Sequence, residues 1–153
     1  MASARTVLTI WRNLHLADAM IRERLNATLM ARADCSLLEH DLLAWVFAAP
    51  SQRLRMAELA GLLQVTPGGL TRIVDRTVER GWIERDRPAS NRREVHAVLT
   101  SAGRGILRAA RSPYLAVLQE AIAGQFDDAD LAALLGLSQK LLDGLHPGPG
   151  RCH

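Results

Sequence analysis

TPGGLTRIVDRTVERGWIERDRPASNRREVHAVLT, residues 66–100, is the segment that decides the fold of this 153-residue chain. It opens with the signals of a helix, because Thr66 is a good N-cap, Pro67 suits the first helical turn, and Gly81 is typical of a helix end. The apolar residues between them recur at spacings of three and four, which predicts one buried stripe. That stripe consists of Leu70, Ile73, Val74 and Val78.

A β-hairpin is predicted directly behind this helix. Residues 82–86 and 94–99 are short runs with strand character, and the loop between them, residues 87–93, contains Pro, Ser and Asn. A shorter helix is predicted over 56–63, just before the quoted segment. Two helices joined by a tight turn and followed by a two-stranded ribbon form a winged helix-turn-helix.

The second of these helices is predicted to present a polar face to DNA. A major groove is wide enough to admit a helix, whose N-terminal residues then reach the base edges. Gly68 and Gly69 carry no side chain that would hold the backbone away from the duplex, and Arg72 suits a bidentate contact with guanine, worth ~1–3 kcal/mol of discrimination. The predicted DNA-contacting residues of this helix are Thr66, Gly68, Gly69, Thr71, Arg72 and Arg76.

The hairpin is predicted to add a second contact with DNA. Its tip carries Arg92 and Arg93, and the negative potential of the minor groove attracts arginine. The loop residues Arg87 and Asn91 complete the predicted contact set. The alternative is that these arginines only brace the hairpin. A helix in the major groove and an arginine-tipped wing in the minor groove would together clamp the duplex.

The charge distribution favours the same function. Residues 51–100 hold nine arginines and six acidic residues, so their balance of +3 equals the net charge of the whole chain. The segments before and after, 1–50 and 101–153, are each balanced. A basic patch on a near-neutral body is typical of a protein that binds a polyanion, although a solvated surface can have the same composition.

Further helices are predicted on both sides of this unit, which makes the fold mainly α with a small β-hairpin wing. Ser36 and Glu39 form a capping box, and Thr100 and Asp127 are good N-caps. Apolar residues at helical spacing support each of these segments. The predicted flanking helices span 3–32, 36–48, 100–124, with a break near Pro113, and 127–145.

Several short motifs occur together in residues 55–104. They are Leu59-Ala60, Thr71-Arg72, Gly81, Asn91-Arg92-Arg93 and Leu99-Thr100-x-x-Gly103. In this combination the chain resembles the MarR family of winged-helix transcriptional regulators. It departs from the family pattern at Gln64, where the turn usually has glycine, and at Asn91, which replaces an acid. A family salt bridge that orients the wing arginine would then become a neutral hydrogen bond.

The resemblance implies an obligate homodimer in which the first helix and the last two interlock around a two-fold axis. Two recognition helices would then reach half-sites about one DNA turn apart, ~34 Å, on a pseudo-palindromic operator. The leucine-rich helices at both ends agree, since they have no obvious partner in so small a monomer. The predicted regions are helical dimerisation over 1–35 and 105–146, a winged helix-turn-helix DNA-binding domain over 36–104, and a flexible tail over 147–153.

The resemblance also implies a small aromatic or acidic effector that modulates DNA affinity, held between the dimer helices and the DNA-binding lobe. Aromatic walls with a few polar groups suit such a site. The candidate residues are Trp11, His15, Asp41, Trp45 and Tyr114. Alternatively, the two tryptophans belong to the core, and His15 and Asp41 form a structural hydrogen-bonded pair.

Different classes of function have less support in the sequence. The two cysteines, Cys35 and Cys152, make no disulfide framework, and no metal-ligand set, cofactor motif or nucleophile–base motif is present. The apolar neighbours of Cys35 favour a buried structural role, while its place before a helix leaves a thiol-based redox sensor as an alternative. The sequence is also compatible with a winged-helix module that binds protein instead of DNA, and more weakly with a small enzyme.

The location of the protein is predicted from what the sequence lacks. No run reaches 18 apolar residues, and the first residues carry no secretory signal. We therefore expect a cytoplasmic protein that does not enter a membrane.

Overall fold

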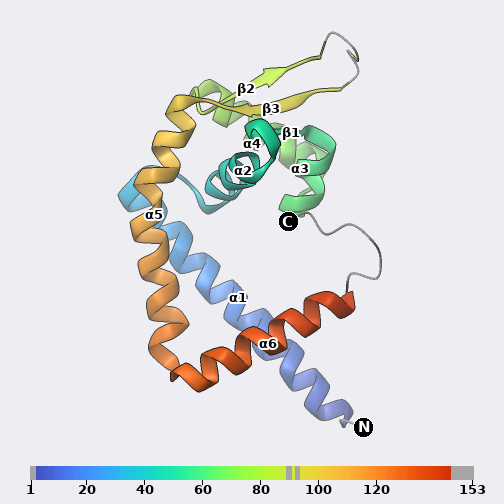
Figure 1. Cartoon of the computed structure of the whole chain (residues 1–153), viewed down its shortest axis with the longest axis vertical. Helices are drawn as coiled ribbons and strands as arrows, with labels where there is room; N and C mark the ends of the chain where they lie inside the picture. Colours follow the sequence, from blue (N-terminus) through green and yellow to red (C-terminus); the bar gives the residue numbers. More distant parts are fainter. Residues whose placement is uncertain (1–2, 89–90, 92–93, 146–153) are drawn as a thin grey trace. The chain divides into compact units, whose positions relative to one another are not determined.

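The computed structural model describes residues 3–88, 91 and 94–145, which form helices and one small sheet (Figure 1). The prediction of a mainly α fold with a small β-hairpin is confirmed. The elements in chain order are α1 (Ala4–Ala33), α2 (Leu37–Ala48), the 3₁₀ turn η1 (Pro50–Gln52), β1 (Arg53–Arg55), α3 (Met56–Leu63), α4 (Pro67–Glu79), β2 (Ile83–Asp86), β3 (His96–Leu99), α5 (Ser101–Ala121), the 3₁₀ turn η2 (Ala123–Gln125) and α6 (Asp128–Leu145).

The chain forms two compact units, Met1–Val117 and Leu118–His153. The second unit contains η2 and α6, and no residue of α6 is buried. Asp127 caps α6 as expected, because its Oδ1 accepts a hydrogen bond of 2.8 Å from the Asp130 N–H. Within the described residues, no helix combines the length and the apolar character needed to cross a lipid bilayer.

The three strands form an antiparallel sheet in the order β1-β3-β2. Figure 1 shows β2 and β3 as a ribbon beside α4. In this ribbon Ile83 lies opposite Leu99, and Asp86 lies opposite His96. On the other edge of β3, Arg55 of β1 is also paired with His96. The sequence left β1 unassigned because three residues are too few to show the two-residue period of a strand.

The core of the first unit lies between α2, α4 and the sheet. The predicted stripe of α4 is buried at Leu70, Ile73 and Val74, and Val78 is partly buried. The remaining fully buried members come from each neighbouring element, namely Cys35, Leu42, Leu43, Val46, Leu59, Trp82, Ile83, Ala97 and Leu99. One core therefore fixes α4 and the ribbon in a single rigid arrangement.

Three residues of the family motifs meet where α4 ends and α5 begins. Gly81 has a φ of +69°, a conformation that favours glycine. The Thr100 hydroxyl lies 2.7 Å from the Gly81 carbonyl oxygen and accepts a hydrogen bond of 3.0 Å from the Gly103 N–H. A Cβ atom at Gly103 would lie only 2.2 Å from the Trp82 carbonyl oxygen. The motif therefore joins the two helices through backbone contacts that no larger residue permits at position 103.

Two local expectations differ from the structure. The break predicted near Pro113 does not occur, because α5 continues through this residue to Ala121. The turn between α3 and α4 needs a left-handed residue, and Gln64 supplies it with a φ of 53°. Glycine adopts this conformation more readily, which is why the family pattern has glycine at this position. Gln64 departs from the pattern but adopts the same conformation, so the turn is unchanged.

Candidate nucleic-acid interface

The exposed face of α4 carries the residues that the sequence predicted for DNA contact. Thr66 begins the helix as predicted, since its hydroxyl accepts a hydrogen bond of 3.2 Å from the Gly69 N–H. Thr71 donates a hydrogen bond of 3.0 Å to the Pro67 carbonyl oxygen. Gly69 is half-buried. The exposed residues of this face are Thr66, Gly68, Thr71, Arg72 and Arg76.

The two glycines of this helix differ in what surrounds them. A Cβ atom at Gly69 would lie 3.2 Å from the Thr66 hydroxyl, so the cap itself leaves little space there. A Cβ atom at Gly68 would meet nothing within 4 Å. Packing around position 68 therefore does not require glycine, and a bare backbone at this place suits the close approach of an external partner.

Arg87 and Asn91, which lie between β2 and β3 in the chain, are both exposed. The Asn91 side-chain amide donates a hydrogen bond of 3.0 Å to Glu94, and the Glu94 N–H donates one of 3.1 Å to the Asn91 carbonyl oxygen. This contact is not the neutral hydrogen bond predicted between Asn91 and the wing arginine, which stays a prediction. Arg92 and Arg93, the predicted wing tip, lie outside the described residues.

Other arginines of this region brace the sheet. Arg85 of β2 pairs with Asp75 of α4, and Arg53 of β1 pairs with Asp86 of β2. Arg55 Nε lies 3.4 Å from a carboxylate oxygen of Glu94. These ion pairs give Arg53, Arg55 and Arg85 a structural role. Arg72 and Arg87, in contrast, form no ion pair among the described residues.

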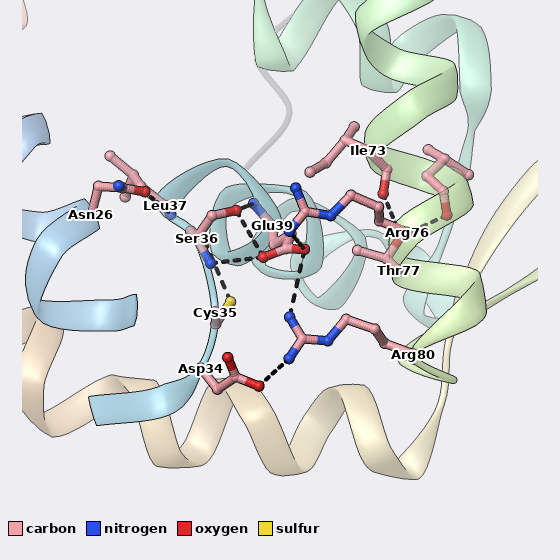
Figure 2. A network of polar contacts seen from close by, with 11 residues as sticks. Asn26, Asp34, Cys35, Ser36, Leu37, Glu39, Ile73, Arg76, Thr77 and Arg80 are labelled. Atoms are coloured by element: carbon pink, nitrogen blue, oxygen red, sulfur yellow. Dashed lines mark hydrogen bonds and ion pairs between the residues drawn. The ribbon is translucent and has the colours of Figure 1, made fainter. Parts of the chain in front are cut away.

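Arg76 is the exception on the exposed face of α4, because one end of its guanidinium is engaged. Its Nη2 atom lies 3.2 Å from Oε1 of Glu39, a residue of α2 that is completely buried (Figure 2). The sequence identified Glu39 only as part of a capping box and missed this contact. Arg76 and Arg80 lie one helical turn apart, so both reach the same acid, but this spacing alone does not identify Glu39 as the partner.

Known proteins with this architecture were compared with the chain. The MarR family model matches residues 36–95, which contain α2, α3, α4 and β2. A solved MarR-family regulator from Streptomyces coelicolor, Sco3205 in complex with DNA, is 26% identical with a TM-score of 0.81, covering 97% of this chain and 96% of that one. Over this region the chain is similar to the MarR family of transcriptional regulators.

Two further proteins are similar to the chain. A mutant of E. coli MarR complexed with operator DNA is 25% identical with a TM-score of 0.77, covering 93% of this chain and 99% of that one. The uncharacterized HTH-type transcriptional regulator YpoP of Bacillus subtilis is 32% identical over 90 residues. That alignment covers 57% of this chain and 61% of YpoP, so the chain matches about three fifths of the length of this curated relative.

A cavity of about 840 Å³ lies in the first unit of the chain. Three of the five predicted effector-binding residues, Asp41, Trp45 and Tyr114, line it together with Arg22 and Asp18. Arg22 Nη2 lies 3.7 Å from an Asp41 carboxylate oxygen. Burial, and then the nearby charge of Asp41, raises the pKa of the Tyr114 phenol. The remaining lining residues are Leu38, His40, Ala44, Leu62, Leu63, Gln64 and Val65.

The other two predicted residues, Trp11 and His15, do not line this cavity. Both are exposed residues of α1, and their rings stack with centroids 6.0 Å apart. No hydrogen bond joins His15 to Asp41 in the described part of the chain, because Asp41 instead contacts Arg22 and His40. The expected core position of the two tryptophans is wrong, since Trp11 is 66% exposed and Trp45 is 44% exposed.

Cys35 is a buried thiol of the core. Burial, and then the nearby charge of Glu39, raises its pKa from 9.0 to about 12. Its Sγ atom donates a hydrogen bond of 3.4 Å to the Ser36 carbonyl oxygen. Reactive cysteines have lowered pKa values and partial exposure, so these properties favour the structural role over redox sensing.

Proposed function

We propose that this chain is a homodimeric DNA-binding transcriptional regulator, and specifically a repressor that acts by occupying its operator. The observation that carries the proposal is the exposed face of α4. Gly68, Thr71 and Arg72 point away from the core there, and Arg72 forms no ion pair among the described residues. In this proposal α4 enters the major groove and the arginine-tipped wing reaches the minor groove. The two solved relatives described in complex with DNA support it.

Footprinting on the DNA upstream of the gene, followed by binding measurements on the protected site, tests this proposal. Arg72→Ala should weaken specific binding by about 1–3 kcal/mol and relax the preference at one base position. Arg93→Ala should weaken binding to all sequences and reduce the slope of log K against log salt by about 0.9 per phosphate contact. If both variants bind as the wild type does, the DNA-contact assignment is wrong. Duplex binding without salt dependence would instead favour a protein-interaction module.

The homodimer is proposed from the apolar surfaces of α1 and α6. Large apolar side chains are exposed on each of these helices, which is unusual for the surface of a soluble monomer. On α1 they are Val7, Leu8, Ile10, Trp11, Leu14, Leu16, Met20 and Met30, and on α6 they are Leu134, Leu135, Leu137, Leu141, Leu142 and Leu145. A second copy of the chain is the partner we propose for them. Light scattering should give a mass of about twice the monomer mass of 16.8 kDa, and a 16.8 kDa species at micromolar concentration would contradict the dimer.

The effector of this regulator is proposed to be a small aromatic or acidic compound held in the cavity. Trp45 and Tyr114 offer aromatic walls, and the half-exposed Arg22 offers a guanidinium for a carboxylate. Helix α2 carries both Asp41, which lines the cavity, and Glu39, which contacts Arg76 of α4. A bound ligand would thus act close to the DNA-contacting helix and favour a dimer whose two helices no longer match the half-site spacing.

Thermal shift against a panel of aromatic acids tests the effector. A ligand at 100 times its Kd should stabilise the protein by about 2.7 kcal/mol, and Arg22→Gln should remove the shift. His15→Gln is the matched control, because His15 does not line the cavity. A shift that survives in Arg22→Gln but disappears in His15→Gln would move the site away from the cavity to the surface of α1 around Trp11 and His15.

A further inference from the structure

The first turn of α2 contains a buried acid with two different sets of partners. Glu39 is fully buried, and its Oε2 atom accepts hydrogen bonds from the Ser36 N–H at 2.7 Å and the Ser36 hydroxyl at 2.8 Å. These bonds complete the capping box of α2. They use only one carboxylate oxygen, so the capping function does not explain the position of the other.

The second oxygen, Oε1, is directed at α4. It lies 3.2 Å from Arg76 Nη2 and 3.7 Å from Arg80 Nη1 (Figure 2). Among the described residues it accepts no well-aligned hydrogen bond, so charge holds this contact. A buried carboxylate is costly unless cations balance it, which means that the two arginines are required on this side of α4.

The two arginines are not equivalent. Arg80 is held on several sides, since it also pairs with Asp34 and its guanidinium lies 4.0 Å from the centre of the Trp82 ring. Its side chain is 29% exposed. Arg76 has Glu39 as its only ion-pair partner among the described residues, and its side chain is 58% exposed. Arg80 therefore anchors α4, while more than half of the Arg76 side chain remains exposed to solvent.

We propose that Glu39 is a positioning residue for DNA binding, which holds Arg76 so that its exposed edge contacts a backbone phosphate. This inference rests on the proposed function. A guanidinium carries five N–H donors in a planar fork, so one nitrogen contacts Glu39 while the others contact a phosphate. Because the buried acid restrains the side chain before DNA arrives, less conformational freedom is lost on binding.

The proposal and simple electrostatics predict opposite changes in DNA affinity when the charge of Glu39 is removed. Removing a negative charge near DNA should strengthen binding if Glu39 acts only through its charge. If Glu39 positions Arg76, Glu39→Gln should weaken binding roughly tenfold, because an amide nitrogen facing the two arginines no longer attracts them. The slope of log K against log salt should also fall by about 0.9 for each Arg76 contact that is lost.

The experiment measures fluorescence anisotropy of the wild-type, Glu39→Gln, Arg76→Ala and doubly substituted full-length chains on the footprinted operator, over a range of salt concentrations. All measurements are made well below the unfolding temperature of each variant, as determined by circular dichroism. Glu39→Gln should cost nothing further in the Arg76→Ala background, because both changes remove one contact. Glu79→Gln is the matched control, since this exposed acid of α4 has no ion pair among the described residues, and it should leave affinity unchanged or slightly higher.

Two further variants keep the test decisive if Glu39→Gln fails to fold. Arg76→Lys changes an exposed position and keeps the charge, but an ammonium lacks the fork needed to contact acid and phosphate together, so roughly tenfold weaker binding is expected. Ser36→Ala weakens the capping box and leaves Oε1 facing the arginines, so the salt slope should stay at the wild-type value. Wild-type affinity in Glu39→Gln or Arg76→Lys, or additive effects in the double variant, would overturn the inference. Absence of duplex binding by the wild type would overturn the proposed function instead.

Discussion

Asp75 of α4 and Arg85 of β2 form an ion pair that joins the helix proposed to contact DNA to the first strand of the ribbon. Both side chains are partly exposed, at 46% and 37%. The pair lies outside the apolar core, so it adds a second link between two elements that the core already holds together. Because Arg85 is paired and less exposed than Arg76, less of its side chain is available to a phosphate.

The Asp75–Arg85 pair leads to a prediction about which wing arginines contribute to DNA affinity. Arg85→Ala should lower the free energy of unfolding by about 0.5 kcal/mol, because exposed ion pairs contribute little, and should leave the salt slope of DNA binding unchanged. Arg87→Ala should reduce that slope by about 0.9 with no loss of stability, because Arg87 is exposed and forms no ion pair in the described chain. Anisotropy titrations in parallel with urea melts distinguish the two. A lower slope in Arg85→Ala would mean that this ion pair opens on DNA.

A second prediction concerns Gly103 at the start of α5. Gly103→Ala should destabilise the protein by about 2 kcal/mol or more, because the added Cβ atom would lie 2.2 Å from the Trp82 carbonyl oxygen and 2.7 Å from the Leu99 side chain. Gly105→Ala is the matched control, since its nearest neighbour would be the end of the Arg108 side chain at 3.9 Å. In the same helix this change should be neutral or stabilising by up to about 1 kcal/mol. Equal melting temperatures for the two variants would contradict the close approach of α5 to the end of α4.

A third prediction concerns the left-handed residue of the turn between α3 and α4. Gln64→Gly should raise the free energy of unfolding by about 0.5–1 kcal/mol, because glycine relieves the steric cost of a φ of 53° but loses more chain entropy on folding. Gln64→Ala keeps the Cβ atom and should give no such gain. Chemical denaturation of the three proteins measures the difference. Stabilisation by alanine as well as glycine would show that the glutamine side chain, and not the backbone, is the source of strain.

The features of the fold that follow from local chemistry were predictable from the sequence. Thr66, Pro67 and Gly81 fixed the bounds of α4, and Ser36 with Glu39 fixed the start of α2. Strand β1 was not predictable, because its three residues become a strand only by pairing with β3, forty residues later in the chain. The continuation of α5 through Pro113 was likewise not predictable, because it depends on the other residues of α5, whereas proline by itself favours a break.

In the candidate site, too, some features follow from local sequence and others depend on how the helices pack. The exposed face of α4 follows from the helical period, since the residues opposite the apolar stripe point away from the core. The contact of Glu39 with Arg76 depends on how α2 and α4 cross, which no local pattern encodes. The cavity was partly predictable, because Asp41 and Trp45 lie one turn apart on one helix. The contribution of Arg22 from α1 required the packing of two helices that are separate in sequence.

The buried thiol of Cys35 gives a prediction about stability at high pH. Its folded pKa of about 12 lies above the value of 9.0, so the unfolded state releases the proton first. The contribution of this group to stability is therefore complete below pH 9 and is lost as the pH rises toward 12, with a slope of at most about 1.4 kcal/mol per pH unit. Urea melts between pH 8 and 11 should show a shallower loss in Cys35→Ala than in the wild type, although this variant is less stable at neutral pH because of the cavity it leaves.

The rate at which a thiol reagent labels Cys35 distinguishes a structural role of this residue from a redox-sensing role. In Cys152→Ser, where Cys35 is the only cysteine, labelling of the native protein by a thiol reagent at pH 7.5 should be slower than labelling in urea by a factor on the order of a thousand. The reason is that a pKa higher by about three units reduces the thiolate fraction a thousandfold, and burial restricts access further. Peroxide treatment should leave operator binding by this variant unchanged. Rapid native-state labelling, together with a loss of operator binding that a reductant reverses, would instead make Cys35 the sensing residue.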